Sequence, residues 1–508
     1  MPLDILVLAD LHYPRNPSPE LPRHGNLARL LYRKALRKLR HENITPNLVV
    51  ILGDLLDDPA VPDAQHHLEL LAEELMRDGI RVLALPGNHD DPRRVAEIFD
   101  CAPGLHVVDG HGFIIFHDEY LANEPYTFLR SEADLALPET VARENPGLPL
   151  VALQHAPLWE KTPEKLRLKN SAQALASYEK SGVILSLSGH LHEGHEPVQI
   201  GPANCVTLPA FCEPPFVFFH VRLDADAATF NRHQLSLPEN IPLADTHCHT
   251  AFAQCATTST FAENRRVSEL LGLRTLAFTE HAFQLYFPNP LSWSFKWQHD
   301  PAFAESVWRD PSRGRMAAYK RFINARPRDP NLLSGLELDL FDNGKLLLHP
   351  DDAGGWNIFL GAMHRIQSAE RGMPPARVES LFMRDLHALL SHPIDILAHP
   401  FRIFKHYNVA PPVHLYDETA RLLAEAQVAA ELNFHESPPD PAFYKACLRR
   451  GTKISLATDS HALLAVADLH PHLAFLANLG LTPRDFPEIL LDPAALPRRC
   501  GSHSCLPI

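Results

Sequence analysis

Residues 5–12 have the sequence Ile-Leu-Val-Leu-Ala-Asp-Leu-His, an apolar run that ends in Asp10 and His12. Such a run predicts a buried strand, because a strand that is covered on both faces needs apolar side chains on both. Similar runs follow in the first half of the chain, at residues 47–52, 81–85, 150–153 and 183–187. Helical spacing of Leu and Ala separates the earlier runs, so the first half is predicted to be a layered α/β fold.

The second half of the chain shows the same pattern with different spacing. Its apolar runs lie at residues 244–247, 275–280, 332–337, 358–364, 394–399, 428–433 and 453–459. Seven strand-like runs with helical stretches between them predict a (β/α) barrel whose polar residues lie at its C-terminal mouth. Residues 223–242 lack a clear period, and 508 residues exceed what one core usually serves. We therefore expect two domains, at residues 1–235 and 243–508.

Composition limits the class of protein and its surroundings. The formal charge of −14 counts against broad affinity for nucleic acid, although a local basic groove remains open. No run approaches the roughly 20 apolar residues of a membrane helix, and the N-terminus does not resemble a signal peptide. The eight cysteines are thinly scattered, which suits a reducing compartment. We expect a cytoplasmic protein without a membrane partner.

Polar clusters at the ends of the first runs carry the chemistry of the first half. They are Asp10-Leu11-His12, Gly53-Asp54, Gly87-Asn88-His89-Asp90, His155 and Gly189-His190-Leu191-His192. Imidazole and carboxylate suit Zn, Mn or Fe, and one carboxylate can bridge two cations. A single histidine more often packs or hydrogen-bonds than binds a metal. Five such clusters at strand ends instead predict a dinuclear metal site that acts on phosphoesters.

In order and spacing these clusters resemble the D-x-H, GD, GNH(D), H and GHxH motifs of the calcineurin-like metallophosphoesterases. The resemblance covers residues 1–235, and residues 86–91 look like the compact cyclic-nucleotide-phosphodiesterase branch. It implies a layered αββα sandwich with two metals and with His89 as the general acid or as a stabiliser of phosphoryl charge. It further implies one metal held by Asp10, His12, Asp54 and His192, and another held by Asp54, Asn88, His155 and His190.

The second half opens with a further set of candidate ligands, Asp245-Thr246-His247-Cys248-His249. Histidines at positions i and i+2 of a strand point to the same face, so both can reach one metal. Later runs end in the remaining candidates: Glu280-His281, Glu337, His364, His399-Pro400 and Asp459-Ser460-His461.

These motifs resemble the PHP (polymerase and histidinol phosphatase) family over residues 243–508, and Glu431-Leu432-Asn433 is similar to its histidinol-phosphatase branch. The resemblance implies a distorted (β/α)7 barrel with two or three metals. The ligands implied for the first metal are His247, His249, Glu337 and Asp459. A second metal would share Glu337 and add His364 and His399, and a third would take His281 and His461.

The third metal position of the second half depends on Cys255. Many PHP relatives place a histidine six residues after the HxH motif, and Cys255 stands there in this chain. A thiolate is a good zinc ligand. The alternative is that Cys255 is a small buried residue and the third position is weak or empty. Asp245 and Glu280 are predicted to orient the histidines.

Other polar and aromatic residues have two interpretations each. Arg402 is a candidate ligand for substrate phosphate, together with Lys405, and the alternative is a solvated loop charge. The basic run 33–41 could attract nucleic acid, but we expect the solvated face of a helix that packs on the first sheet. The aromatic residues of segment 293–297 are predicted to pack in a core or lid rather than to stack on substrate.

The predicted function is that of a bifunctional metal-dependent phosphoesterase. Its substrates would be phosphodiesters or phosphomonoesters of small molecules such as (cyclic) nucleotides, and its cofactors Mn, Fe or Zn, two in the first domain and two or three in the second. The alternatives are a nuclease acting on DNA or RNA ends, or one active domain with one ligand-sensing domain. Nucleic acid is the less favoured partner, and the sequence does not indicate an oligomeric state.

Overall fold

A computed structural model of the chain describes residues 2–496 apart from 122, 125, 225–226, 257, 309–314 and 328. The chain divides into two compact units, Met1–Ser236 and Leu237–Ile508. Among the described helices, none is long and apolar enough to cross a membrane.

The first unit contains two main sheets. One has the order β13-β12-β1-β2-β3, and the other has the order β10-β11-β9-β8-β5-β4. Strands β1, β2 and β3 are parallel, and so are β5, β8, β9 and β11. The strands are β1 (Leu3–Leu8), β2 (Leu48–Leu52), β3 (Arg81–Leu85), β4 (Gly104–Val108), β5 (His111–Ile115), β6 (Glu119–Tyr120), β7 (Phe128–Leu129), β8 (Leu150–Leu153), β9 (Val183–Ser188), β10 (His195–Ile200), β11 (Ala203–Thr207), β12 (Val217–Leu223) and β13 (Ala228–Gln234).

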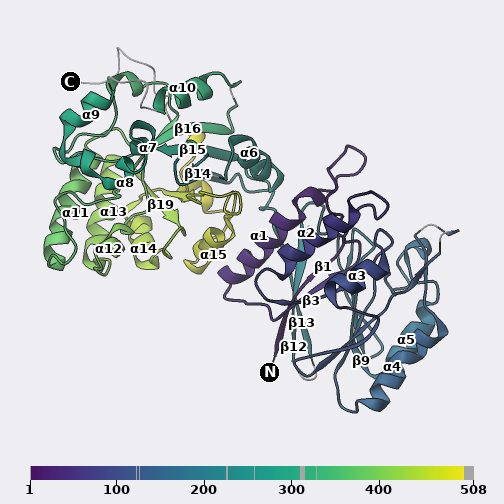
Figure 1. Cartoon of the computed structure of the whole chain (residues 1–508). Coiled ribbons are helices and arrows are strands. Elements are labelled where there is room, and N and C mark those ends of the chain that lie inside the picture. The colour runs from purple at the N-terminus through teal and green to yellow at the C-terminus, as the bar shows by residue number, and fades with distance from the viewer. Residues whose placement is uncertain are drawn as a thin grey trace. The chain divides into compact units, whose positions relative to one another are not determined.

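Helices cover the two sheets of the first unit from opposite sides (Figure 1). They are α1 (Ala28–His41), α2 (Ala64–Met76), α3 (Pro92–Phe99), α4 (Glu132–Glu144) and α5 (Ser171–Ser181). Helices α4 and α5 bury Val141, Ala174 and Tyr178 against apolar side chains of the second sheet. The predicted α/β pattern of the first half is confirmed, because the apolar runs at the predicted positions form strands β1, β2, β3, β8 and β9.

The basic run 33–41 lies on α1, where acidic residues at the end of the neighbouring α2 pair with it. Arg33 and Arg40 both contact the Asp78 carboxylate, at 2.9 and 2.6 Å. Arg33 also lies 3.6 Å from Glu74. These pairs neutralise part of the run within the unit. The expected solvated face is found only in part, because Arg40 and His41 are exposed whereas Lys34 and Lys38 are buried.

One expectation about the boundary between the units is wrong. Residues 223–242 were expected to be irregular, but residues 228–234 form β13 at the edge of the first sheet, antiparallel to β12. An edge strand that is largely exposed has no apolar run, so its signal is weak in the sequence.

The second unit is built on a parallel seven-stranded sheet of order β14-β15-β16-β17-β18-β19-β20. An isolated parallel bridge joins Cys248, at the end of β14, to Ser460, just after β20, so the sheet nearly closes into a barrel. The strands are β14 (Ala244–Cys248), β15 (Thr275–His281), β16 (Leu332–Leu338), β17 (Ile358–Gly361), β18 (Ile396–Leu397), β19 (Ala429–Asn433) and β20 (Ile454–Ala457). All seven predicted strands are present, although β17 and β18 are shorter than their apolar runs.

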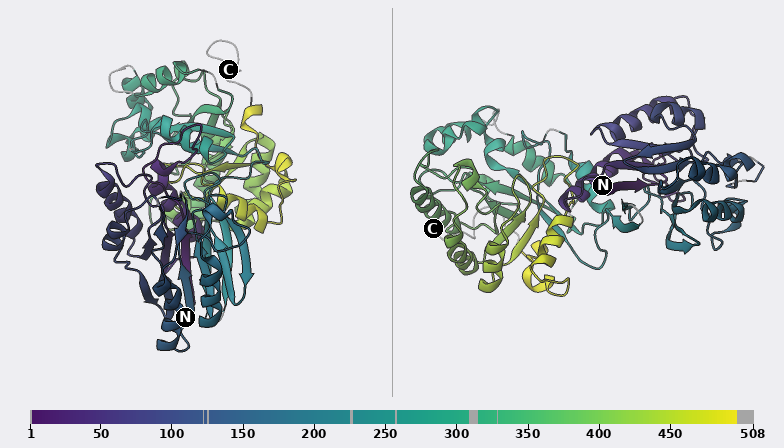
Figure 2. Two further views of the ribbon diagram at one scale, coloured as in Figure 1. Left: turned by 90° about the vertical axis from the view of Figure 1, so that its right-hand side faces the viewer. Right: turned by 90° about the horizontal axis from the view of Figure 1, so that it is seen from below.

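Helices surround the barrel strands of the second unit (Figure 2). They are α6 (Phe261–Leu270), α7 (Ala282–Tyr286), α8 (Leu291–Ser294), α9 (Pro301–Trp308), α10 (Met316–Asn324), α11 (Pro375–Leu390), α12 (Ile403–His406), α13 (Tyr416–Ala426), α14 (Pro441–Arg450), α15 (His470–Asn478) and α16 (Phe486–Ile489). Apolar residues such as Leu386, Leu423 and Phe443 are buried on their inner faces.

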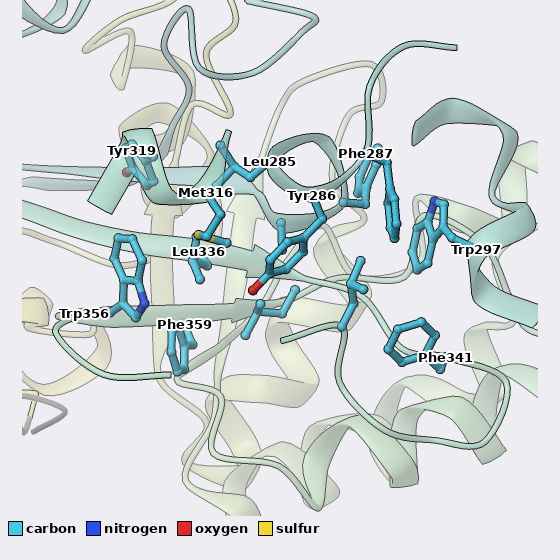
Figure 3. Close-up of a cluster of buried hydrophobic side chains, with 14 of the residues drawn as sticks. Leu285, Tyr286, Phe287, Trp297, Met316, Tyr319, Leu336, Phe341, Trp356 and Phe359 are labelled. Atoms are coloured by element: carbon cyan, nitrogen blue, oxygen red, sulfur yellow. The ribbon is translucent and has the colours of Figure 1, made fainter. Parts of the chain in front are cut away.

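A long segment between β15 and β16 forms an aromatic core of its own. Figure 3 shows side chains of α7 and α10 packed with those of β16, β17 and the loops beside them. Trp297 and Trp356 are buried there, and the prediction of core packing is confirmed for Trp297. Trp293 differs, since 42% of it is exposed and its ring lies 6.2 Å from that of His281. This core holds the segment against the C-terminal end of the barrel.

Candidate metal centres

The candidate ligands of the first unit follow strands of its two sheets. Asp10 and His12 follow β1, and Asp54 follows β2. Asn88 and His89 follow β3, while His155 follows β8, and His190 and His192 follow β9. Because parallel strands end at the same edge of a sheet, the fold gathers these side chains into one place.

The gathered side chains form two groups of donor atoms that Asp54 connects. Asp10, His12 and His192 have donor atoms within 4.8 Å of one another, and so do Asp54, His155 and His190. Asp54 Oδ2 lies 3.7 Å from His12 Nε2 in the first group and 3.5 Å from His155 Nε2 in the second. The two groups have the composition that the resemblance implied, with one carboxylate placed to be shared.

Some buried donor atoms in these groups make no hydrogen bond. The side-chain oxygen of Asn88 and the Nε2 atom of His155 are buried and have no hydrogen-bond partner among the described residues. Such atoms are rare in proteins and need an explanation. A cation that they coordinate satisfies them, so the residues present fit a metal here.

Hydrogen bonds hold the imidazole rings in one orientation. The Nδ1 atom of His155 donates to the Leu52 carbonyl at 2.7 Å, and the Nε2 atom of His190 donates to the Tyr126 carbonyl at 2.9 Å. His192 Nδ1 lies 2.8 Å from a carboxylate oxygen of Glu213. A carbonyl or carboxylate can only accept, so it takes the N–H of each ring and leaves the other nitrogen free for a metal.

Asp57 and Asp90 organise the loops around this centre. Asp90 accepts hydrogen bonds from the main-chain amides of Leu55, Leu56 and Gly87, at 2.9–3.0 Å. It therefore ties the loop that carries Asp54 to the loop that carries Asn88. Asp57 contacts His12 Nδ1 at 3.4 Å, and its carbonyl accepts from the Nδ1 atom of His89 at 2.6 Å. His89 thus keeps its Nε2 atom for other contacts at the partly exposed side of the centre.

The backbone at these ligands is held in an unusual conformation. Asp10, His12, Asp54 and His190 have φ angles of 55°, 45°, 50° and 67°, in the left-handed region. Residues other than glycine adopt it at an energetic cost, and such residues gather at functional sites. Gly53 shows why the loops are tight, because a Cβ atom there would overlap the ring of His155.

The charges of the first centre are strongly coupled. Burial disfavours a charged His155, but the Asp54 carboxylate outweighs burial and raises the pKa of His155 to about 9. Burial also acts on Asp54, yet the facing His155 and His12 hold its pKa well below the usual range. Burial, followed by the charge of His155, lowers the pKa of His190 to about 3. Asp54 is therefore an ionised carboxylate in a buried place, as a bridging ligand must be.

Glu213, which no sequence motif indicated, allows a test of how the orientation of the His192 ring affects metal binding. We expect Glu213→Gln to weaken metal binding in the first unit by about 10–100-fold, because His192 loses its carboxylate partner. The measurement is metal affinity by competition with a chelator. Glu179→Gln on the exposed face of α5 is the matched control, with unchanged affinity. An unaltered affinity in Glu213→Gln would show that Glu213 does not act on the metal site.

The second unit gathers its own ligands at the ends of its barrel strands. His247 Nε2 lies 3.1 Å from His249 Nε2, 3.3 Å from Glu337 Oε2 and 3.5 Å from Asp459 Oδ1. His249 Nε2 lies 3.2 Å from Asp459 Oδ1. A tetrahedral cation with ligand bonds of about 2.0–2.1 Å separates its ligands by about 3.3–3.4 Å. Separations of 3.1–3.5 Å lie near this spacing, whereas His249 Nε2 and Glu337 Oε2 are 3.8 Å apart.

Glu337 reaches a second group with its other oxygen. Glu337 Oε1 lies 2.9 Å from His399 Nε2 and 3.4 Å from His364 Nε2. The ring of His249 lies 4.2 Å from that of His281 and 4.4 Å from that of His461, and these three residues have donor atoms within 4.8 Å of one another. The structure thus gathers the histidines predicted for the second and third metals.

Cys255 has a different environment from the other predicted ligands. Its sulfur lies 3.3 Å from the amide nitrogen of Gln284 and 3.6 Å from the amide oxygen. Burial raises the pKa of its thiol to about 12. The thiol is partly buried and contacts the Gln284 amide, so both ligation of a third metal by Cys255 and its alternative stay predictions.

Carboxylates orient the histidines of the second unit. Glu431 accepts from His247 Nδ1 at 2.6 Å, and Asp339 lies 3.0 Å from His364 Nδ1. Glu280 lies 3.6 Å from His249 Nδ1, close to where it was predicted to act. Asp245 contacts no ring among the described residues; its carboxylate accepts from Thr458 and from the main-chain amide of His247, so it can act on this histidine only through the backbone.

The surroundings of this second centre are strongly acidic and buried. Buried carboxylates gather there, each at most 1% exposed: Asp245, Glu280, Glu337, Asp339, Glu431 and Asp459. Arg402 donates to Asp459 Oδ2 at 2.7 Å, so the structure brings this predicted phosphate ligand to the centre. Buried carboxylates of this number require cations. The residues present fit divalent metal ions, which carboxylate and imidazole groups bind.

Comparison with known proteins finds a similarity in the first unit. Residues 3–194 match the family model of the calcineurin-like phosphoesterases. No curated protein matches the chain. The match covers every candidate ligand of the first unit, from Asp10 to His192.

Several solved structures are similar to part of the chain. A dimetal phosphatase from Danio rerio is 16% identical, with a TM-score of 0.39, and the match covers 46% of this chain and 96% of that one. The protein TT1561 of Thermus thermophilus is 14% identical, with a TM-score of 0.33 and coverage of 46% and 99%. GAP50, the anchor in the inner membrane complex of Plasmodium, is 12% identical, with a TM-score of 0.30 and coverage of 47% and 89%.

The family match and the site geometry agree on the chemistry of the first unit. Residues 3–194 match the calcineurin-like phosphoesterase model, and the unit gathers carboxylates and imidazoles in two connected groups. The chain is a metal-dependent phosphoester hydrolase. Divalent metal ions are its cofactors.

Proposed function

We propose that the chain is a bifunctional phosphoesterase with a separate metal centre in each unit. The PHP resemblance of residues 243–508 supports the second centre. The observation that carries the proposal is the pair of buried carboxylates, Asp54 and Glu337, each of which reaches two groups of imidazole nitrogens. A carboxylate in this position holds two cations close together, which is the arrangement that phosphoryl transfer uses.

In the first centre, we propose that Asp10, His12, Asp54 and His192 hold one metal, and that Asp54, Asn88, His155 and His190 hold the other. Bound cations would activate water and neutralise charge on the phosphoryl oxygens. His89 is fixed by the carbonyl of Asp57, so its Nε2 atom can donate a proton or a hydrogen bond to the phosphoester. Asp90 holds the loops of Asp54 and Asn88 in place by accepting hydrogen bonds from both of them.

In the second centre, we propose that His247, His249, Glu337 and Asp459 hold one metal, and that Glu337, His364 and His399 hold another. His281 and His461 would hold a third. Arg402 lies beside Asp459 with 16% of its side chain exposed, and its guanidinium can bind a phosphate oxygen. Lys405 is farther out, and its ammonium donates to the carbonyl of Glu436.

We propose that the two centres act on related small molecules. The first would open a phosphodiester, which can be cyclic, and the second would remove the resulting monoester. Both steps are hydrolyses, so each adds one water and needs no further reactant. The −14 charge of the chain favours small phosphoesters over nucleic acid polymers as substrates.

Two substitutions in the full chain test this proposal. Asp54→Ala is expected to lower hydrolysis of bis-aryl phosphate and cyclic nucleotides by at least about a hundredfold, because the bridging carboxylate is lost. His249→Ala is expected to lower hydrolysis of nucleotide monoesters by a similar factor. Each variant should keep the other activity, measured with Mn, Zn and Fe in turn.

Matched controls are Asp63→Ala and His66→Ala, which alter exposed residues near the start of α2. Both should retain the two activities. If either active-site variant removes both activities, the two centres do not act independently. If His249→Ala leaves every activity unchanged, the second unit is not a phosphoesterase.

A further inference from the structure

A cavity of about 460 Å³ lies in the second unit, beside its candidate metal centre. At one end it is lined by His399, Arg402, Glu431 and Asn433. His399 is a candidate ligand, and Arg402 and Asn433 both contact the Asp459 carboxylate, at 2.7 and 3.3 Å. The cavity is therefore continuous with the place where a phosphate would be hydrolysed.

The rest of the cavity wall is mainly apolar and rigid. Phe401, Tyr416 and Phe443 are buried and pack on one another, with ring centroids 4.7–5.6 Å apart. Pro411 and Pro438 line another part of the wall, and the proline ring fixes the backbone there. Such a wall is formed before a ligand binds and so loses little entropy on binding.

The size and lining of the cavity indicate the ligand. A volume of about 460 Å³ lies near the lower end of the range for small-molecule sites. It suits one compact organic group and not a chain of several nucleotides. The apolar wall favours an uncharged ring system, while the Arg402 end favours an anion.

We propose that this cavity is the specificity pocket of the second centre. It holds the organic group of a phosphomonoester, an uncharged aromatic or heterocyclic group the size of a nucleoside, while the phosphate lies toward His399 and Arg402. The inference rests on the proposed function of the second unit, and it adds the class of substrate that this centre selects.

Trp293 is an alternative position at which the aromatic group of a substrate could bind. It is largely exposed and lies beside His281, on the segment between β15 and β16. It offers a single ring face at the surface, whereas the cavity can surround a ligand on several sides. We therefore place the organic group in the cavity, and the experiment compares the two positions.

The test fills the cavity in the full chain and measures binding directly. Ala410 and Ser437 line the cavity, so Ala410→Trp and Ser437→Trp each place an indole in or beside it. Calorimetry with adenosine 5′-monophosphate and with inorganic phosphate gives two affinities per variant. We expect the nucleotide affinity to fall by at least about tenfold and the phosphate affinity to change by less than about twofold. Ala477→Trp, at an exposed position of α15, is the matched control and should bind as the parent does.

The same variants are also assayed for hydrolysis with Asp54→Asn added to silence the first centre. We expect KM for the nucleotide to rise with little change in kcat, and glycerol phosphate to be hydrolysed as before. The inference is overturned if both Ala410→Trp and Ser437→Trp bind the nucleotide as the parent does. A result in which only Trp293→Ala loses nucleotide affinity would place the organic group at Trp293 instead. If Glu337→Gln removed no hydrolysis, the proposed function of the second unit would be contradicted instead. The calorimetry would still test the cavity.

Discussion

Replacing Glu337 with Gln is expected to empty two metal positions of the second unit at once. Its two oxygens lie 3.3 Å from His247 Nε2 and 2.9 Å from His399 Nε2, and the side chain is fully buried. Gln keeps the shape but loses the charge, and its amide nitrogen cannot coordinate a cation. Monoester hydrolysis by this unit should fall at least about a thousandfold, which corresponds to about 4 kcal/mol.

The measurement is metal content per chain after removal of free metal, together with activity on a nucleotide monoester. His364→Ala is the informative comparison, because that residue contacts only one oxygen of Glu337 and should cost one metal rather than two. Glu370→Gln, at an exposed position, should cost none. A loss of only one metal in Glu337→Gln would show that the carboxylate is not shared.

Arg130→Ala is expected to destabilise the first unit by about 3–5 kcal/mol, since it leaves a buried carboxylate unpaired. Arg130 donates to both oxygens of Asp118, at 2.7 and 2.9 Å, and to the hydroxyl of Tyr178 at 2.6 Å. Its guanidinium also lies 3.6 Å above the ring of Phe116. Tyr178 in turn donates to Gln154, the residue before His155. The loss should therefore affect metal binding as well as folding.

Calorimetry of thermal unfolding measures this loss of stability. The transition of the first unit should move to a lower temperature in Arg130→Ala. Arg143→Ala, at an exposed position of α4, is the control and should change stability by less than about 0.5 kcal/mol. Removing Asp118 as well should cost less than the sum of the two single substitutions, because the pair is lost only once. Equal stability of Arg130→Ala and the parent would contradict a structural role for this pair.

The strands that carry the candidate ligands could be predicted from the sequence. A central parallel strand is covered on both faces, so it must be an apolar run, and the polar residue that ends it marks the edge of the sheet. This reasoning located β1, β2, β3, β8 and β9 in the first unit and all seven strands of the barrel. It missed the other strands of the two main sheets, β4, β5, β10, β11, β12 and β13. For β13 the reason is that an edge strand needs no apolar run.

The types of donor atom could also be predicted, because coordination chemistry restricts them to carboxylate, imidazole and amide oxygen. The residues that orient them were harder to find. Asp339 follows Glu337 by two positions, directly after β16 ends, so the two-residue spacing of a strand could have indicated it. Glu213 has no such signal, since it lies on a loop that only the fold brings to His192.

Residues 5–12 show where the sequence alone is sufficient to predict the local structure. Local chemistry determined that Ile5 to Leu8 form a buried strand and that Asp10 and His12 follow it. The tertiary structure decided that Asp54 lies between two groups of ligands, that Arg130 pairs with Asp118, and that a cavity adjoins His399. These features join residues far apart in the chain, so they depend on how strands and loops pack, and no local pattern encodes them.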